Sequence, residues 1–189
     1  KVFTNPEAGE VGHDSEVGVG KCSLCHLVEP LEVNGPILFT DYTYDNLGLY
    51  PNPLNPAYPT KDFGVGMVVS DPTLYGAVKV PTLRNVAKSP GNTVKAFGHN
   101  GVFKSLEQIV HFYNTRDKRS DPLDPAYCVA PLPMTATGLE AMGADDCWPA
   151  PEFPATMNTE ELGNLDLSPE EEAAIVAFMK TLSDGWTGG

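Results

Sequence analysis

A C-x-x-C-H motif at residues 22–26 constrains this 189-residue chain more than any other feature of its sequence. Two cysteines three positions apart share one turn of helix, so their thiols reach the two vinyl groups on one edge of a porphyrin and form thioethers. The histidine that follows supplies an axial ligand to the iron without any long-range contact. We therefore expect one covalent haem c, attached through Cys22 and Cys25, with His26 as the proximal iron ligand.

Two other uses of closely spaced cysteines fit the sequence less well. A zinc site built on C-x-x-C needs a second pair of ligands, and the remaining cysteines, Cys128 and Cys147, are too widely spaced to provide it. A redox-active dithiol would follow a strand in a βαβ pattern, and no such pattern surrounds Cys22. The motif therefore favours haem attachment over both.

The composition predicts one domain that is rich in loops. The length is that of a single domain, so residues 1–189 are expected to form one cytochrome c domain, larger than a single haem requires. Proline and glycine number 18 each while aromatic residues are 9%, which predicts ordered loops around a modest core. A formal net charge of -13 disfavours nucleic acid and anionic lipid as partners.

The sequence also predicts an exported protein. No apolar run reaches the roughly 18 to 20 residues that cross a bilayer, so no membrane span is expected. Haem c is attached after export, and the chain begins at Lys1 instead of a methionine, so we expect that a signal peptide has been removed. The expected location is the periplasm.

The two cysteines outside the motif, Cys128 and Cys147, lie in an irregular proline-rich excursion at residues 116–157. In an oxidising compartment an even pair of this kind favours a disulfide, with two buried free thiols as the alternative. We expect a Cys128–Cys147 disulfide.

Hydrophobic periodicity and capping residues predict three helices. One begins near residues 14–15 and runs into the haem motif, and a second covers about residues 104–115 with Ser105 as its cap. The third covers about residues 168–183, because it opens with a capping serine, a proline and acidic residues. Residues 27–71 have neither helical nor strand periodicity, so we expect a long loop over the haem.

Four further segments carry a family resemblance. They are LFTDYTYDNLG at 38–48, VPTLRNV at 80–86, HNGVFKSL at 99–106 and ELGNL at 161–165. Together they resemble the second haem domain of the bacterial dihaem cytochrome c peroxidase and MauG superfamily. The resemblance implies an all-α fold, in which cytochrome c-like helices surround one covalent haem, with long loops and insertions and with a terminal helix that crosses the N-terminal one.

The sequence differs from this family in the number of its haem-binding motifs. Its peroxidases have two C-x-x-C-H motifs on one chain, whereas this sequence has one. In those enzymes the second domain supplies electrons through a six-coordinate haem, while the other haem cleaves peroxide at an open iron position. The resemblance therefore implies the electron-transfer half, working with a redox partner protein or with a separate catalytic subunit.

The second axial ligand separates electron transfer from peroxide chemistry, because an open site or a tyrosine ligand favours reactions of oxygen or peroxide. The family methionine stands at fixed distances after a His-x-Gly motif and before a Leu-Gly pair, and an insertion here separates these landmarks. Counting forward from His99 gives Tyr113, whereas counting back from Leu162 gives Met157. We prefer Met157, because a thioether suits ferrous iron. The alternatives are Tyr113, an open site, or one of three further methionines, Met67, Met134 and Met142.

Two further residues are candidates for the haem pocket. Arg84 is a candidate partner for a haem propionate, because a guanidinium forms a fork with a carboxylate; a surface ion pair is the alternative. His99 lies in the His-x-Gly turn, where it would bond a propionate or only stabilise the turn. His111 falls on the opposite helix face from Tyr113 and is expected to be solvated.

These observations lead to one preferred function and one alternative. The preferred function is a periplasmic monohaem c-type cytochrome that carries single electrons between redox partners. The alternative is a haem subunit or a peroxidase-like or MauG-like oxidase component with His/Tyr or open haem coordination. Electron transfer is favoured over activity as a stand-alone peroxidase.

Overall fold

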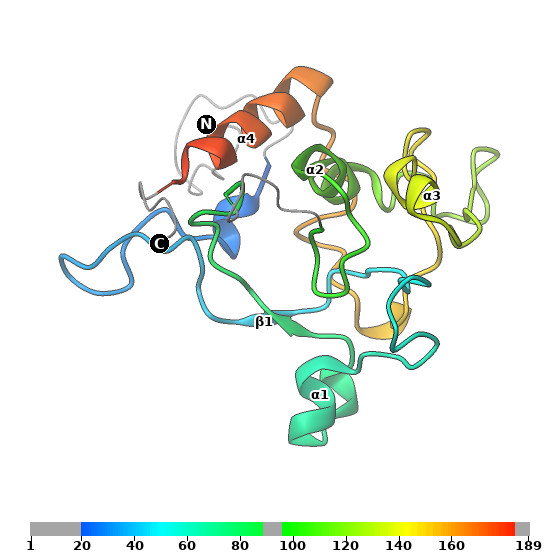
Figure 1. Cartoon of the computed structure of the whole chain (residues 1–189), viewed down its shortest axis with the longest axis horizontal. Coiled ribbons are helices and arrows are strands. Elements are labelled where there is room, and N and C mark those ends of the chain that lie inside the picture. Colours follow the sequence, from blue (N-terminus) through cyan, green and yellow to red (C-terminus); the bar gives the residue numbers. More distant parts are fainter. Residues whose placement is uncertain (1–19, 89–95, 184–189) are drawn as a thin grey trace. The chain divides into compact units, whose positions relative to one another are not determined.

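The computed structural model describes residues 20–88 and 96–183 (Figure 1). These residues divide into two compact units. The first comprises residues 20–43, 80–88 and 165–183, and the second comprises residues 44–79 and 96–164. Each unit is therefore built from segments that are far apart in the sequence.

The main element of the first unit is helix α4 (Pro169–Thr181), drawn in orange to red in Figure 1. The hydroxyl of Ser168 accepts a hydrogen bond from the backbone N–H of Glu171, and the Glu171 carboxylate accepts one from the backbone N–H of Ser168. This reciprocal capping satisfies two N–H groups that have no partner inside the helix. Its buried side chains are Ile175, Val176 and Met179. The helix predicted at residues 168–183 is confirmed to within two residues.

The second unit holds the remaining named elements except the 3-10 turn η1 (Cys22–Leu24). They are β1 (Tyr44–Asp45), α1 (Gly64–Val69), η2 (Pro72–Leu74), β2 (Val78–Lys79), α2 (Leu106–Thr115), α3 (Ala136–Glu140) and η3 (Pro154–Thr156). Strands β1 and β2 pair antiparallel, with Tyr44 opposite Lys79. Helix α2 confirms the second predicted helix, because the Ser105 hydroxyl accepts a hydrogen bond from the backbone N–H of Gln108.

An aromatic cluster forms the core of the second unit. Tyr50, Phe103, Phe112 and Trp148 are all buried, and their ring centroids lie 5.0 to 6.5 Å apart. The indole N–H of Trp148 donates to the hydroxyl of Thr115, whereas the hydroxyl of Tyr50 is buried and has no hydrogen-bond partner among the described residues. Burial raises the pKa of Tyr50, so the ring is held as a neutral phenol.

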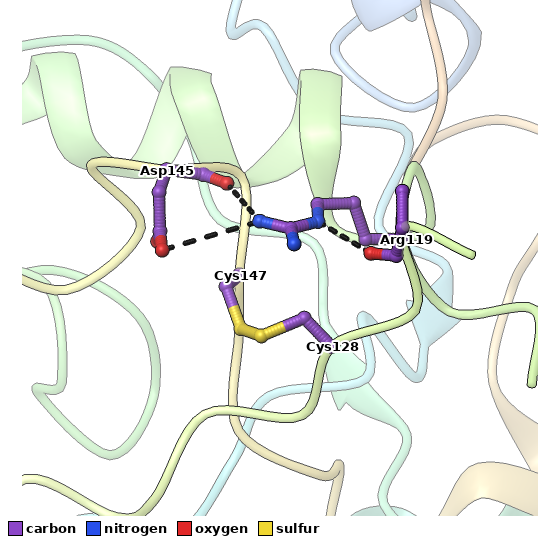
Figure 2. The surroundings of a disulfide bond; sticks show 5 residues. Arg119, Cys128, Asp145 and Cys147 are labelled. Atoms are coloured by element: carbon purple, nitrogen blue, oxygen red, sulfur yellow. Dashed lines mark hydrogen bonds and ion pairs between the residues drawn. A yellow bond between two sulfur atoms is a disulfide. The ribbon is translucent and has the colours of Figure 1, made fainter. Parts of the chain in front are cut away.

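The proline-rich excursion at residues 116–157 contains the predicted disulfide. Cys128 and Cys147 are bonded, with their Cα atoms 5.6 Å apart (Figure 2). The guanidinium of Arg119 lies beside this bond, where Nε donates to the carbonyl of Ala126 and Nη1 donates to the carbonyl of Asp145. The disulfide and the arginine therefore fasten the two sides of the excursion to each other.

The predicted all-α fold class is wrong. The described residues contain only four α-helices, of 6, 10, 5 and 13 residues, together with a two-stranded antiparallel sheet. Long stretches without regular structure connect these elements (Figure 1). Strands of two residues are too short to show the alternation that predicts a strand, so no sequence pattern indicated the sheet.

Three other predictions concern the N-terminal helix, the number of domains and membrane spans. The helix expected near residues 14–15 lies outside the described residues. A single domain over residues 1–189 stays a prediction. None of the helices within residues 20–88 and 96–183 has the length and apolar character of a membrane-spanning segment.

Removing the disulfide should destabilise the protein. We expect the double substitution of Cys128 and Cys147 by serine to lower the free energy of unfolding by about 2 to 4 kcal/mol, because the bond closes a loop between cysteines 19 positions apart. Denaturant unfolding of the oxidised protein measures the loss, with the half-exposed Val129→Ser as a control in the same loop. Equal stability of the wild-type protein before and after reduction of the bond would contradict this expectation.

The unpartnered hydroxyl of Tyr50 gives a second prediction. Tyr50→Phe should leave the free energy of unfolding unchanged or raise it, because it removes a buried polar group that makes no hydrogen bond. Tyr50→Ala should cost about 3 to 5 kcal/mol, because it leaves a cavity among three aromatic rings. Thermal and denaturant unfolding compare the two variants, and a large loss for Tyr50→Phe would show that the hydroxyl has a partner.

Candidate functional site

The C-x-x-C-H motif lies in the first unit on one tight turn. Lys21 adopts a left-handed conformation (φ 48°) and the chain then enters η1. The backbone N–H of His26 donates to the carbonyl of Cys22 over 2.8 Å, which closes the turn around the motif. Both cysteines and the histidine are thus presented by five consecutive residues, as covalent attachment of haem c requires.

Neither cysteine of this turn is in a disulfide, in contrast to the bonded pair at 128 and 147. The Cys22 thiol donates to the carbonyl of Gly20 over 3.0 Å. Burial raises the pKa of Cys22 to about 12, so the group is held as a neutral thiol. Cys25 is partly exposed. Both sulfurs are therefore available to form thioethers.

The imidazole of His26 is oriented by a backbone carbonyl. Its Nδ1 lies 2.8 Å from the carbonyl oxygen of Phe39, and since a carbonyl only accepts, Nδ1 carries the proton. Burial lowers the pKa of His26, while the carbonyls of Phe39 and Pro81 and the charge of Asp41 oppose the shift. A histidine that ligates a metal through one nitrogen characteristically donates from the other in this way. The donor set of the turn therefore fits haem c.

The segment that holds His26 is fixed in turn by the rest of the first unit. Phe39 has a positive φ of 53° and its ring meets the ring of Phe178 of α4 edge to face, with centroids 6.0 Å apart. The buried hydroxyl of Thr40 donates to the carbonyl of Val80 over 2.7 Å. The carbonyl that orients His26 is thus anchored both to the last helix and to the segment around residue 80.

Arg84 also lies in the first unit, as part of the VPTLRNV segment. Its Nη1 donates to the carbonyl of Ile37 over 3.0 Å, two residues before Phe39. The hydroxyl of Thr82 donates to the carbonyl of Leu38 beside it. Arg84 therefore holds the segment that orients His26, and its contact with a haem propionate stays a prediction.

The preferred distal candidate, Met157, lies in the second unit directly after η3. Its thioether packs on Gly48, where an added Cβ would lie 2.2 Å from Sδ. The next residue, Asn158, donates from its backbone N–H to the carbonyl of Asn46 over 2.9 Å. Met157 is thus held between a 3-10 turn and a bonded asparagine, against a position that only glycine fits.

The alternative candidate, Tyr113, lies on α2 of the same unit. Its carbonyl accepts a hydrogen bond of 2.6 Å from the backbone N–H of Gly163, and the Gly163 carbonyl accepts one of 2.7 Å from the backbone N–H of Asp117. Gly163 belongs to the Leu-Gly landmark from which Met157 was counted. The structure therefore joins Tyr113 directly to the Leu-Gly landmark, so one candidate is bonded to the loop at residues 157–163 and the other begins it.

Arg116, which was not among the residues predicted from the sequence, joins these segments. Its side chain is only 4% exposed. Nη1 donates to the carbonyl of Leu47 and Nη2 to the carbonyl of Asn158, each over 2.7 Å, while Asp117 pairs with the guanidinium. Nothing in the sequence marks an arginine after a helix as a link between distant loops, because its partners are backbone carbonyls.

The three other methionines that are candidates have different surroundings. Met67 and Met134 are 60% and 63% exposed, and Met142 packs against the aromatic cluster. None of the three is held as Met157 is, between bonded segments of loop.

The two remaining histidines of interest also lie in the second unit. His99 borders a polar cavity of about 250 Å³, with Nε2 4.0 Å from the carboxylate of Asp62. Burial lowers the pKa of His99, and the charge of Asp62 opposes this shift. His111 was expected to be solvated, but its Nε2 lies 3.0 Å from the carboxylate of Asp146 and 3.1 Å from the carbonyl of Gly143. Pairing with a distant loop cannot be seen in helical periodicity, so this expectation was wrong.

Comparison with known proteins identifies relatives that are longer than this chain. The sequence is 32% identical over 173 residues to the methylamine utilization protein MauG of Paracoccus denitrificans, covering 86% of this chain and 39% of that protein. No protein-family model matches the sequence.

Two solved structures share the fold. The dihaem peroxidase BthA from Burkholderia thailandensis matches with a TM-score of 0.61 and 26% identity, over 89% of this chain and 40% of that one. A MauG-like protein associated with microbial copper homeostasis matches with a TM-score of 0.53 and 22% identity, over 87% of this chain and 43% of that one. The chain thus spans about two fifths of the length of these relatives. Sequence and fold together show that it is homologous to part of MauG and of the dihaem peroxidases.

Proposed function

We propose that the chain is a monohaem c-type cytochrome that carries single electrons between redox partners. The observation that carries this proposal is the turn at residues 22–26, with two cysteines outside any disulfide and a histidine whose Nδ1 is bonded to a carbonyl. Cys22 and Cys25 would hold the haem through thioethers, and His26 would bind its iron through Nε2. The homology to proteins described as dihaem peroxidases supports a haem of this type.

The electron-transfer role rests on the ligand opposite His26. When bound, the haem supplies an iron that cycles between the ferrous and ferric states. Met157 is the preferred partner of that iron, because a His/Met pair favours electron transfer at a raised potential. Its loop is held by hydrogen bonds at Asn158 and by packing on Gly48, which suits a ligand that has to stay in place in both oxidation states. The chain would correspond to the electron-transfer half of a dihaem peroxidase.

A second function is favoured by the position of Tyr113 and by the relationship to MauG. Tyr113 is bonded through its carbonyl to the same loop that carries Met157, so it lies close to the preferred candidate in the fold. Coordination by His26 and Tyr113 would favour oxidative chemistry, in a haem subunit or in a MauG-like or peroxidase-like component. In that function the chain would work with a separate catalytic subunit.

The net charge and the disulfide indicate the kind of partner and the location that we propose. A net charge of -13 favours a redox partner with a basic surface, since opposite charges accelerate encounter. The Cys128–Cys147 disulfide is typical of oxidising compartments, which supports export to the periplasm.

Covalent haem attachment can be tested by mass. After expression with cytochrome c maturation proteins, we expect the mass of the chain plus exactly one haem, and no bound haem after denaturation of the variant with Cys22→Ala and Cys25→Ala. The variant with serine at 128 and 147 is the control, because it removes the other pair of cysteines and should keep its haem. A wild-type chain that releases its haem on denaturation would exclude thioether bonds.

The distal ligand can be tested by substitution and spectroscopy. Met157→Ala should abolish the weak far-red ferric absorption band that a sulfur–iron bond produces, and should lower the reduction potential, because thioether ligation stabilises ferrous iron. Tyr113→Phe should leave both unchanged. The opposite pattern, with the ferric spectrum altered by Tyr113→Phe alone, would favour the oxidative function.

A further inference from the structure

One guanidinium fastens both segments that surround Met157. Nη1 of Arg116 donates to the carbonyl of Leu47, which precedes the glycine on which the Met157 sulfur packs. Nη2 donates to the carbonyl of Asn158, which follows Met157 directly. Arg116 therefore spans the gap between the surface that supports the thioether and the loop that carries it.

The charge of Arg116 is buried but paired. Nε donates to one carboxylate oxygen of Asp117 over 2.8 Å, and Nη2 contacts the other oxygen. The Arg116 side chain is 4% exposed and that of Asp117 is 19% exposed. A two-point pair of this kind fixes the plane of the guanidinium, so the N–H groups that face the two carbonyls have a set direction.

Two glycines make room for this arrangement. A Cβ added to Gly48 would lie 3.2 Å from Nη1 of Arg116, in addition to its clash with the Met157 sulfur. A Cβ added to Gly163 would lie 2.7 Å from Nη2 and 2.0 Å from the Asp117 carboxylate. Both glycines have positive φ, at 71° and 104°. The backbone is therefore shaped around the guanidinium on two sides.

We propose that Arg116 is a positioning residue for the Met157 thioether and thereby sets how firmly the sulfur binds the haem iron. This proposal rests on Met157 as the distal ligand. Arginine is required because its rigid fork reaches two carbonyls and one carboxylate together, whereas a lysine ammonium is a single point of contact on a flexible stem. Without the fork, the loop at residues 157–163 would gain freedom, and Met157 would hold the iron less firmly.

The test uses Arg116→Lys in the haem-loaded protein. We expect this variant to shift the equilibrium between sulfur-bound and sulfur-free ferric iron by about tenfold toward the free form, within the range of couplings between neighbouring sites. Added imidazole, which competes with the sulfur for the iron, should then bind about tenfold more tightly. The far-red sulfur–iron band and an imidazole titration measure both effects.

Arg119→Lys is the matched control, because Arg119 also donates to backbone carbonyls in the second unit but holds the disulfide loop. It should leave imidazole affinity unchanged. A double-mutant cycle separates positioning from general loosening: in the Met157→Ala background, Arg116→Lys should have no further effect on imidazole affinity. An equal effect in both backgrounds, or no effect in the wild-type background, would overturn the proposal.

If Arg116→Lys fails to give folded protein, Asp117→Asn provides the same test, because it keeps the guanidinium and weakens the pair that orients it. We expect a shift of the same sign, and no shift would overturn the proposal. Failure of the proposed function gives a different result, in which Met157→Ala itself leaves the far-red band intact. Loss of the band in Met157→Ala with no change in the arginine and aspartate variants would show a methionine ligand that Arg116 does not position.

Discussion

The structure depends on side chains that satisfy the backbone of long loops. A buried carbonyl or N–H group outside helices and sheets still needs a hydrogen-bond partner, and regular elements are short in the described part of this chain. The amide of Asn46 donates to the carbonyl of Phe153 and to the hydroxyl of Thr156, each over 2.8 Å. Arg116 joins Leu47 and Asn158 by the same principle. Hydrogen bonds from buried polar side chains therefore hold the loops of the second unit in place.

The same constraint explains how a loop-rich chain could hold its functional groups in place. In the first unit, the carbonyl of Phe39 orients His26, and ring packing on Phe178 anchors Phe39. In the second unit, hydrogen bonds at Asn158 and Gly163 hold the loop that carries Met157 beside helix α2. His26 and Met157 thus lie on irregular backbone whose position is determined by contacts distant in sequence. Electron transfer benefits from such rigidity, because a ligand that stays in place requires little rearrangement between oxidation states.

Features that arise from local chemistry could be predicted from the sequence, and features that arise from distant contacts could not. The α2 and α4 helices follow from their capping serines, and the bonded cysteines from their number and setting. The all-α class was wrong because the family resemblance was extended to segments whose own pattern predicted no helix. Arg116 and His111 were missed or misjudged for another reason: their partners, Asn158 and Asp146, are remote in sequence. The superfamily resemblance was confirmed, because its motifs are short and contiguous.

In the function proposed above, the chain would use a single covalent haem for electron transfer and not for peroxide chemistry. The most direct measurement is the reaction of the purified ferric holoprotein with hydrogen peroxide, followed by rapid-mixing absorption spectroscopy. With His26 and Met157 both on the iron, no coordination position is open, so the ferric spectrum should stay unchanged at equimolar peroxide and no high-valent species should form. Rapid formation of a high-valent iron intermediate would contradict the claim and would favour the MauG-like function.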